Sequence, residues 1–178
     1  MTDSADSRTI AMGANRWITD SRVYNLVWLG RWIERAQTIA RVVRWAARQD
    51  LEDDSQGLET VLSMAANIRG VNVGPDDTAL DMLLTRDSGA SLRGCLVAAR
   101  FNATHVAPVE VIQVIGAAIE LMDSAEEPIT ASEEVVELMD EVLPTLEKLH
   151  AAIEDAWFHS GPLSEEEVYR RFVQQQQQ

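Results

Sequence analysis

The longest periodic pattern in the chain lies between Ser21 and Arg48. Apolar residues recur there at three- and four-residue steps, at Leu29, Ile33, Ala36, Ala40, Val43 and Ala47. This spacing places them on one face of an α-helix, and no proline interrupts the helix before Pro75. The pattern predicts one helix over this stretch, roughly 40 Å long, whose apolar face joins the hydrophobic core.

The opposite face of this helix mixes apolar and charged positions. Its members are Tyr24, Val27, Val42 and Trp45, which flank Arg31, Glu34, Thr38 and Arg41. A helix that is apolar nearly all round is usually buried nearly all round, so we expect Arg31, Glu34, Arg35 and Arg41 to be partly buried. A buried guanidinium needs an anion or several carbonyl groups beside it. Acidic residues of other helices or a bound ligand can supply that charge, and the pattern leaves both open.

Further helices are predicted along the rest of the chain. They cover residues from about 58 to 70, 76 to 85, 91 to 106, 109 to 124, and from 130 or 132 onward. Pro144 is expected to kink or split the last of these, leaving a helix over residues 145–159. Ser164 begins a capping box for a short terminal helix reaching Phe172. Four acidic residues between positions 50 and 54 predict a turn that pairs with Arg44 and Arg48.

These elements predict an all-α fold. We expect a single-domain helical bundle of about five to seven helices over residues 1–173, followed by a glutamine tail at residues 174–178. The long helix should be central. The predicted helix over residues 91–106 can pack closely across the long helix because it is rich in small residues, namely Gly94, Cys95, Ala98, Ala99 and Ala103.

Two polar side chains of that second helix, Arg100 and Asn102, lie on different sides of it. If they meet Arg31, Glu34 and Arg35 where the helices cross, they can form a buried polar network that sets the packing register. The same residues can instead form a binding site, and the pattern does not separate the two interpretations.

Charge and composition narrow the choice of partners. The 178 residues carry a net charge of -14, whereas the stretch from Ser21 to Arg48 holds six arginines and one acid, about +5. The negative total argues against nucleic acid or an anionic membrane as the main partner, because both require a positive field. No basic segment followed by an apolar run opens the chain and no apolar stretch is long enough to span a bilayer, so a cytoplasmic location is expected.

Catalytic and metal-binding patterns are weak. Cys95 is the sole cysteine and lies among small residues of a predicted helix, so we expect a buried thiol and no disulfide. Glu147 and His150 form an isolated Glu-x-x-His, whereas di-iron bundles use two such pairs with further carboxylates. We therefore expect neither a metal nor another cofactor.

The long helix resembles the opening of the alpha-E proteins, an all-helical family with a pattern like S-R-x-x-x-N-L-x-W-x-G-R-x-x-E-R-A. The matching residues are Ser21, Arg22, Asn25, Leu26, Trp28, Gly30, Arg31, Glu34, Arg35 and Ala36. A second family motif is matched by Ser91, Leu92, Ala99, Arg100, Asn102, Ala103 and Val106. The chain departs from that motif at Phe101, Thr104 and Ala107, and nothing after Val106 repeats the Gly-Arg, Glu-Arg helix that longer members carry twice. It resembles a short or divergent member.

The resemblance implies a place beside ATP-grasp ligases, in a system that makes, modifies or trims peptides. One hypothesis is a non-enzymatic accessory or interaction protein, whose arginine-rich helix holds an anionic group or an acidic partner segment. A second is an enzyme in which Glu34 acts as acid or base while arginines orient an anionic substrate. A third is a purely structural charge network. The candidate binding residues are Asn25, Trp28, Arg31, Glu34, Arg35, Arg41, Arg100 and Asn102. The ATP-grasp ligase is the expected partner, and homo-oligomerisation stays open.

Overall fold

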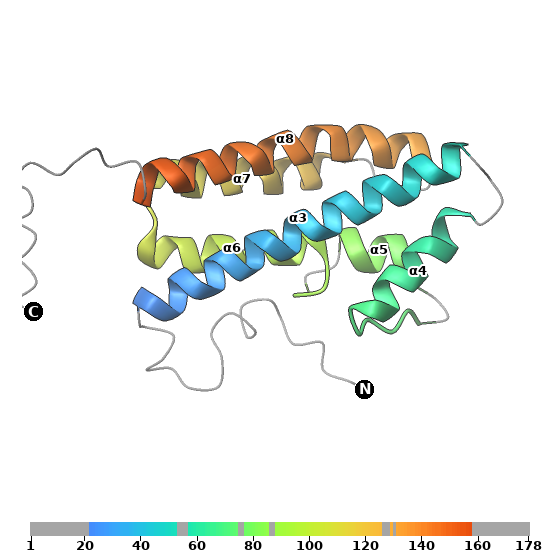
Figure 1. Ribbon diagram of the computed structural model, residues 1–178, viewed down its shortest axis with the longest axis horizontal. Coiled ribbons are helices and arrows are strands. Elements are labelled where there is room, and N and C mark those ends of the chain that lie inside the picture. Colours follow the sequence, from blue (N-terminus) through green and yellow to red (C-terminus); the bar gives the residue numbers. More distant parts are fainter. Residues whose placement is uncertain are drawn as a thin grey trace, which may run out of the picture.

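The computed structural model describes residues 22–52, 57–74, 77–85, 88–125, 129 and 131–157. These residues form six helices and no strand (Figure 1). The helices are α3 (Arg22–Glu52), α4 (Leu58–Ile68), α5 (Ala79–Leu84), α6 (Leu92–Val106), α7 (Val109–Ser124) and α8 (Ser132–Trp157). The all-α prediction is confirmed. The expected terminal helix and the glutamine tail lie outside the described residues, as does Ser21.

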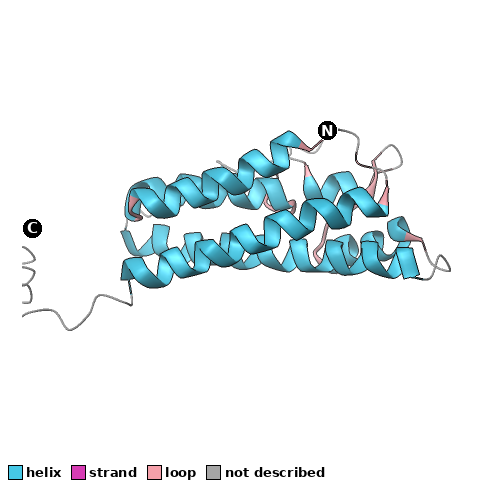
Figure 2. Ribbon diagram, turned by 90° about the horizontal axis from the view of Figure 1, so that it is seen from above, coloured by secondary structure: helices cyan, strands magenta, loops and turns pink. Residues whose placement is uncertain are grey.

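Four long helices form a bundle around one hydrophobic core. Helix α3 packs against α6 and α8, and α7 closes the ring by packing against the same two helices. In Figure 1 both α6 and α8 run antiparallel to α3, while α4 and α5 lie beside the C-terminal half of α3. Figure 2 shows the long helices lying lengthwise beside one another. The long helix is central, and the predicted packing of α6 on it is confirmed.

The apolar face of α3 is buried as its periodicity predicts. Less than a tenth of the side chain is exposed at each of Leu29, Ile33, Ala36, Ala40, Val43 and Ala47. Trp32 joins this face and is completely buried, which makes it one of the largest side chains in the core. Each fully buried aliphatic side chain contributes about 1.5 to 3 kcal/mol, so this face anchors the bundle.

Helix α6 begins where its cap predicts. The Ser91 hydroxyl accepts a hydrogen bond from the backbone N–H of Gly94 at 3.0 Å, which satisfies one of the free donors of the first turn. Small buried residues follow on the side that faces the other helices, namely Gly94, Cys95, Ala98, Ala99 and Ala103. Their size lets α6 approach α3 closely.

The predicted acidic turn after α3 is wrong in its first part. Asp50 and Glu52 belong to α3, which continues to Glu52 because no glycine or proline stops it. Asp50 accepts hydrogen bonds from the backbone N–H of Leu58 at 2.9 Å and from the hydroxyl of Ser132 at 2.5 Å. The carboxylate therefore ties the end of α3 to the beginnings of α4 and α8.

The acidic partner of Arg44 and Arg48 also differs from the prediction. Both guanidinium groups pair with Asp140 of α8, Arg48 at 3.6 Å, and not with Asp50 or Glu52. The reason is tertiary, because α8 packs along α3 and presents Asp140 on its exposed side. Such exposed pairs contribute about 0 to 1 kcal/mol each. The other two acids of the predicted turn, Asp53 and Asp54, lie outside the described residues.

Pro144 was expected to kink or split the last helix, leaving a helix from residue 145, and the split does not occur. Helix α8 is continuous from Ser132 to Trp157 with Pro144 inside it. Proline removes one backbone donor, but Pro144 and Asp140 are exposed, so water can hydrogen-bond the carbonyl that loses its partner. The buried side chains of Val142 and Leu146 hold the helix on the core at either side.

The short helix α5 begins later than predicted, at Ala79 instead of residue 76. The hydroxyl of Thr78 sets this start, because it accepts a hydrogen bond from the backbone N–H of Asp81 at 3.1 Å.

In the part of the chain that the structure describes, no helix has both the length and the apolar character needed to cross a membrane.

Candidate functional site

The charged face of α3 is open to solvent, contrary to the prediction that it is partly buried. The exposed side chains include Arg31, Glu34, Arg35 and Arg41. Large apolar side chains of the same face are also exposed, Val23 by 70%, Val27 by 50% and Trp45 by 55%. The prediction failed because the other helices pack on the core side and on the flank of α3 and leave this face uncovered.

Arg31, Arg35 and Arg41 of this face also lack acidic partners among the described residues. Among the described residues, no ion pair or hydrogen bond involves the side chains of Arg31, Arg35, Arg41 or Glu34. By contrast, Arg44 and Arg48 pair with Asp140, and the side-chain Nε of Arg93 lies 2.6 Å from Asp123. Within the described part of the chain, acids of other helices therefore neutralise arginines at the C-terminal end of α3 and not at the Glu-Arg pair.

Trp28 and Trp32 position Arg31 and Arg35. The rings of Trp28 and Trp32 are stacked with centroids 5.3 Å apart. The guanidinium carbon of Arg31 lies 5.4 Å from the ring centroid of Trp28, and that of Arg35 lies 4.8 Å from the ring centroid of Trp32. Cation–π contacts of this kind contribute about 0.5 to 1 kcal/mol at exposed sites. They hold the arginines against α3 and leave the N–H edges free to bind an anion.

The two asparagines among the candidates are core residues. Asn25 and Asn102 are 1% and 0% exposed. The side-chain amide of Asn102 donates to the backbone carbonyl of Ala98 at 2.8 Å, within its own helix. Arg100 lies on the exposed side of α6. The predicted buried network of Arg100 and Asn102 with the charged residues of α3 is not formed, because those residues are exposed and Asn102 faces the core.

The structure also brings Arg69 close to Arg35 and Cys95, which the sequence did not indicate. Arg69 is the C-cap residue of α4, and its guanidinium is half-buried. Burial lowers the pKa of Arg69, and the nearby positive charge of Arg35 lowers it further. The only sequence signal was a basic residue just before Gly70 at a helix end, a common position for an exposed arginine. Its burial depends on how α4 packs against α3.

Cys95 lies close to these two arginines and is buried, as predicted. Its thiol donates a hydrogen bond to the backbone carbonyl of Gly89 at 3.4 Å. Burial raises the pKa of Cys95 to about 12, although the positive charges of Arg69 and Arg35 act in the opposite direction. A thiol that keeps its proton at neutral pH is a poor nucleophile, so the chemistry of this region is that of the arginines.

Replacing Cys95 with alanine is expected to reduce the loss of stability at alkaline pH. The unfolded chain releases the thiol proton near pH 8.5, whereas the folded protein keeps it until about pH 12. Between these values the unfolded state binds fewer protons, so the free energy of unfolding falls by about 1.4 kcal/mol per pH unit. The stability that depends on the protonated thiol is complete below about pH 8.5 and is lost as the pH rises.

Urea unfolding of both proteins at about pH 8 and about pH 10.5 measures the effect. The stability of the wild type should fall by about 2 to 3 kcal/mol more than that of the Cys95→Ala variant. An equal fall in the two proteins contradicts the assignment, and the comparison cancels the titration of all other groups.

Metal ligands do not gather in the part of the chain that the structure describes. No three His, Cys, Asp or Glu side chains there lie in an arrangement that could hold an ion. Glu147 and His150 of α8 are both exposed.

These observations define the class of protein: it is an all-helical bundle whose central helix displays an exposed Glu-Arg pair. The model of the Alpha-E family, described as a predicted alpha-helical domain with a conserved ER motif, matches residues 21–109. This match covers half of the chain, and the chain belongs to the Alpha-E family. Glu34–Arg35 is the only Glu-Arg pair between residues 21 and 109, so the motif lies on the uncovered face of α3. No curated protein and no solved structure matches the chain.

Proposed function

We propose that this protein is a non-enzymatic helical accessory protein of an ATP-grasp-linked system for peptide ligation or modification. In this proposal the uncovered face of α3 binds an anionic group or an acidic segment of a partner protein. The observation that carries the proposal is the exposure of Arg31, Arg35 and Arg41 without an acidic partner in the described residues. A local cluster of uncompensated positive charge in a chain of net charge -14 is suited to an acidic partner.

Gly30 offers independent support. It lies inside α3, where glycine costs about 0.5 to 1 kcal/mol relative to alanine. A Cβ atom at this position meets nothing within 4 Å, so packing in the described residues does not require glycine there. A close approach by a partner would explain the small residue. Val23 and Val27 lie on the same uncovered face and supply apolar surface for such a contact.

The enzymatic alternative has less support. Glu34 lies on an open helix face, and the described residues form no enclosure around it that would exclude water. General acid or base catalysis depends on a group whose protonation and geometry are controlled by its surroundings. The geometry therefore favours binding over catalysis at the Glu-Arg pair.

Replacing Arg35 with alanine is expected to weaken binding of the proposed partner, an ATP-grasp ligase, by at least about tenfold. Truncating one member of a close interfacial charge pair typically costs about 2 to 5 kcal/mol. Pull-down followed by calorimetry on the purified full-length chain measures the loss. The matched control is Arg48→Ala, an exposed arginine at the other end of α3, which should change the affinity by no more than about twofold.

A second variant guards against an indirect effect of Arg35→Ala on the bundle. Gly30→Leu should preserve the helical circular dichroism signal and still weaken the complex, because it adds bulk only to the uncovered face. Absence of binding by the wild type overturns the proposal. Equal losses with Arg35→Ala and Arg48→Ala also overturn it, since they indicate a general charge effect.

A further inference from the structure

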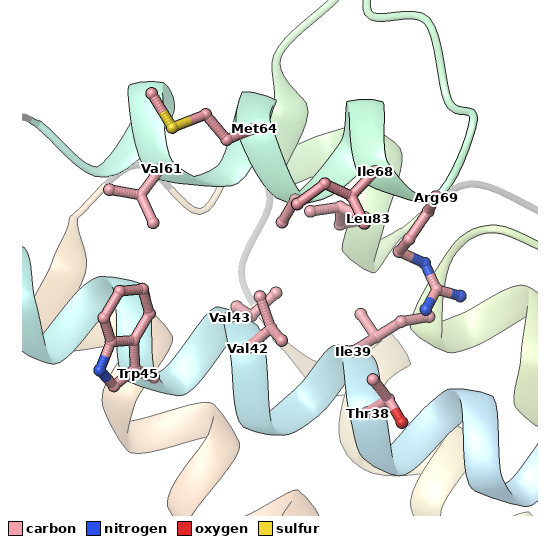
Figure 3. A pocket seen from close by; sticks show the side chains of 11 residues that line it. Thr38, Ile39, Val42, Val43, Trp45, Val61, Met64, Ile68, Arg69 and Leu83 are labelled. Carbon is pink, nitrogen blue, oxygen red and sulfur yellow. The ribbon is translucent and has the colours of Figure 1, made fainter.

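An apolar groove lies between α3, α4 and α5. Its volume is about 380 Å³, and its walls are formed mainly by aliphatic side chains such as Val42 of α3, Val61 of α4 and Leu83 of α5 (Figure 3). Met64 and Ile68 stand at its edge and are 56% and 87% exposed. The groove is therefore open to solvent and lined almost entirely by apolar surface. Its volume falls in the range of small-molecule sites, about 300 to 1,000 Å³.

The two ends of the groove differ in character. Figure 3 shows Trp45 at one end and the guanidinium of Arg69 at the other, beside Ile39. The Nε atom of Arg69 is buried and has no hydrogen-bond partner among the described residues. A buried donor of a charged group without an acceptor costs about 1 to 3 kcal/mol or more, so an acceptor bound at this point would be stabilised.

A second arginine adds positive charge at the same end. Arg35 lies one turn before Ile39 on α3 and is close enough to act electrostatically on Arg69. Neither arginine has an acidic partner in the described part of the chain. Like charges brought together without a counter-charge create a site for an anion.

We propose that this groove binds a small amphiphilic carboxylate, such as a medium-chain fatty acid. The carboxylate accepts hydrogen bonds from Arg69, Arg35 strengthens the positive potential, and the apolar chain lies along the groove toward Trp45. The α3 residues from Thr38 to Trp45 span about 10 Å at the usual rise per residue, which suits an extended medium-chain acyl group. A singly charged head fits better than a phosphate, because Arg69 is the only arginine among the described residues that line the groove. Desolvating a dianion also costs more than desolvating a single charge.

This inference does not depend on the proposed partner of the Glu-Arg pair. It concerns the flank of α3 that faces α4, whereas the proposed partner contacts the uncovered face. Arg35 belongs to both proposals, and Thr38, Val42 and Trp45 at the edge of the uncovered face also line the groove. Arg69 lies at the C-cap of α4, outside that face, so Arg69 is the residue that tests the groove.

Decanoate is the probe, titrated calorimetrically into the purified full-length chain. The Arg69→Gln variant should bind decanoate about 10- to 100-fold more weakly than the wild type, because it loses a charged hydrogen bond. Decanol, which has the same chain and no charge, should bind both proteins equally. The control variant Arg48→Gln removes an arginine of α3 that does not line the groove, and it should leave the affinity for decanoate unchanged.

Val42→Trp fills the groove and keeps Arg69, so it should abolish binding of decanoate and decanol together. This variant decides the question if Arg69→Gln fails to fold. No binding of decanoate by the wild type, or equal binding of decanoate by the wild type and Arg69→Gln, overturns the proposal. Failure of the ATP-grasp ligase to bind leaves the expected decanoate result unchanged, so the two proposals fail separately.

Discussion

Replacing Trp32 with alanine is expected to lower the free energy of unfolding by about 3 to 5 kcal/mol. The side chain is completely buried in the core face of α3, stacks on Trp28 and supports the guanidinium of Arg35. Truncation removes the apolar burial and leaves a cavity that the close-packed bundle can fill only in part. For a chain of this size the melting temperature should fall by about 10 °C or more. Urea and thermal unfolding followed by circular dichroism measure both quantities.

Two further variants separate the effect of burying the Trp32 ring from the effect of its indole N–H. Trp45→Ala removes a tryptophan of the same helix that is 55% exposed, and it should cost much less than Trp32→Ala. Trp32→Phe keeps an aromatic ring and removes the indole N–H, which is buried without a hydrogen-bond partner in the described residues. It should be milder than the alanine change. A similar loss at positions 32 and 45 contradicts the burial of Trp32.

Replacing Gly94 with alanine is expected to destabilise the protein strongly and to displace the loop before α6. A Cβ atom at this position overlaps the backbone carbonyl oxygen of Ser88 and lies 2.6 Å from the carbonyl carbon and the nitrogen of the same residue. Backbone atoms cannot move aside as a flexible side chain does, so either α6 or the loop must shift. Alanine is favoured over glycine in a helix by about 1 kcal/mol, which is too little to offset an overlap of this kind.

Gly116→Ala is the matched control, since Gly116 lies in α7 and an added Cβ meets nothing within 4 Å. It should stabilise the protein by about 0.5 to 1 kcal/mol. The two glycine changes are therefore expected to change the free energy of unfolding in opposite directions. Denaturant unfolding of both variants tests this, and stabilisation by Gly94→Ala contradicts the observed approach of Ser88 to α6.

The positions of several helices could be predicted from local signals. Ser91 caps α6 and Pro108 precedes α7, and both boundaries agree with the structure. The buried face of α3 follows from its three- and four-residue spacing. Pro144 was misjudged because a propensity rule considers the backbone alone. In the folded protein, α8 buries side chains on both sides of the proline, and that packing offsets the lost hydrogen bond.

The candidate site was predicted in part. The family of the chain was identified correctly from the Glu-Arg helix, but the surroundings of that helix were not. Arg31 and Arg35 were expected to be partly buried, with acids of other helices or a bound ligand beside them, whereas they are exposed and rest on tryptophan rings. Arg69 was missed because its sequence position resembles that of any arginine at a helix end.

The sequence by itself determined the helices, the core face of α3 and the presence of a positive helix in an acidic chain, because each depends on residues that lie close together along the chain. Only the tertiary structure decided which charges are compensated. Asp140 neutralises Arg44 across nearly a hundred residues, while no acid in the described residues reaches Arg35. Charge compensation and the groove beside Arg69 depend on which faces the neighbouring helices cover, and that arrangement arises only when the whole bundle packs.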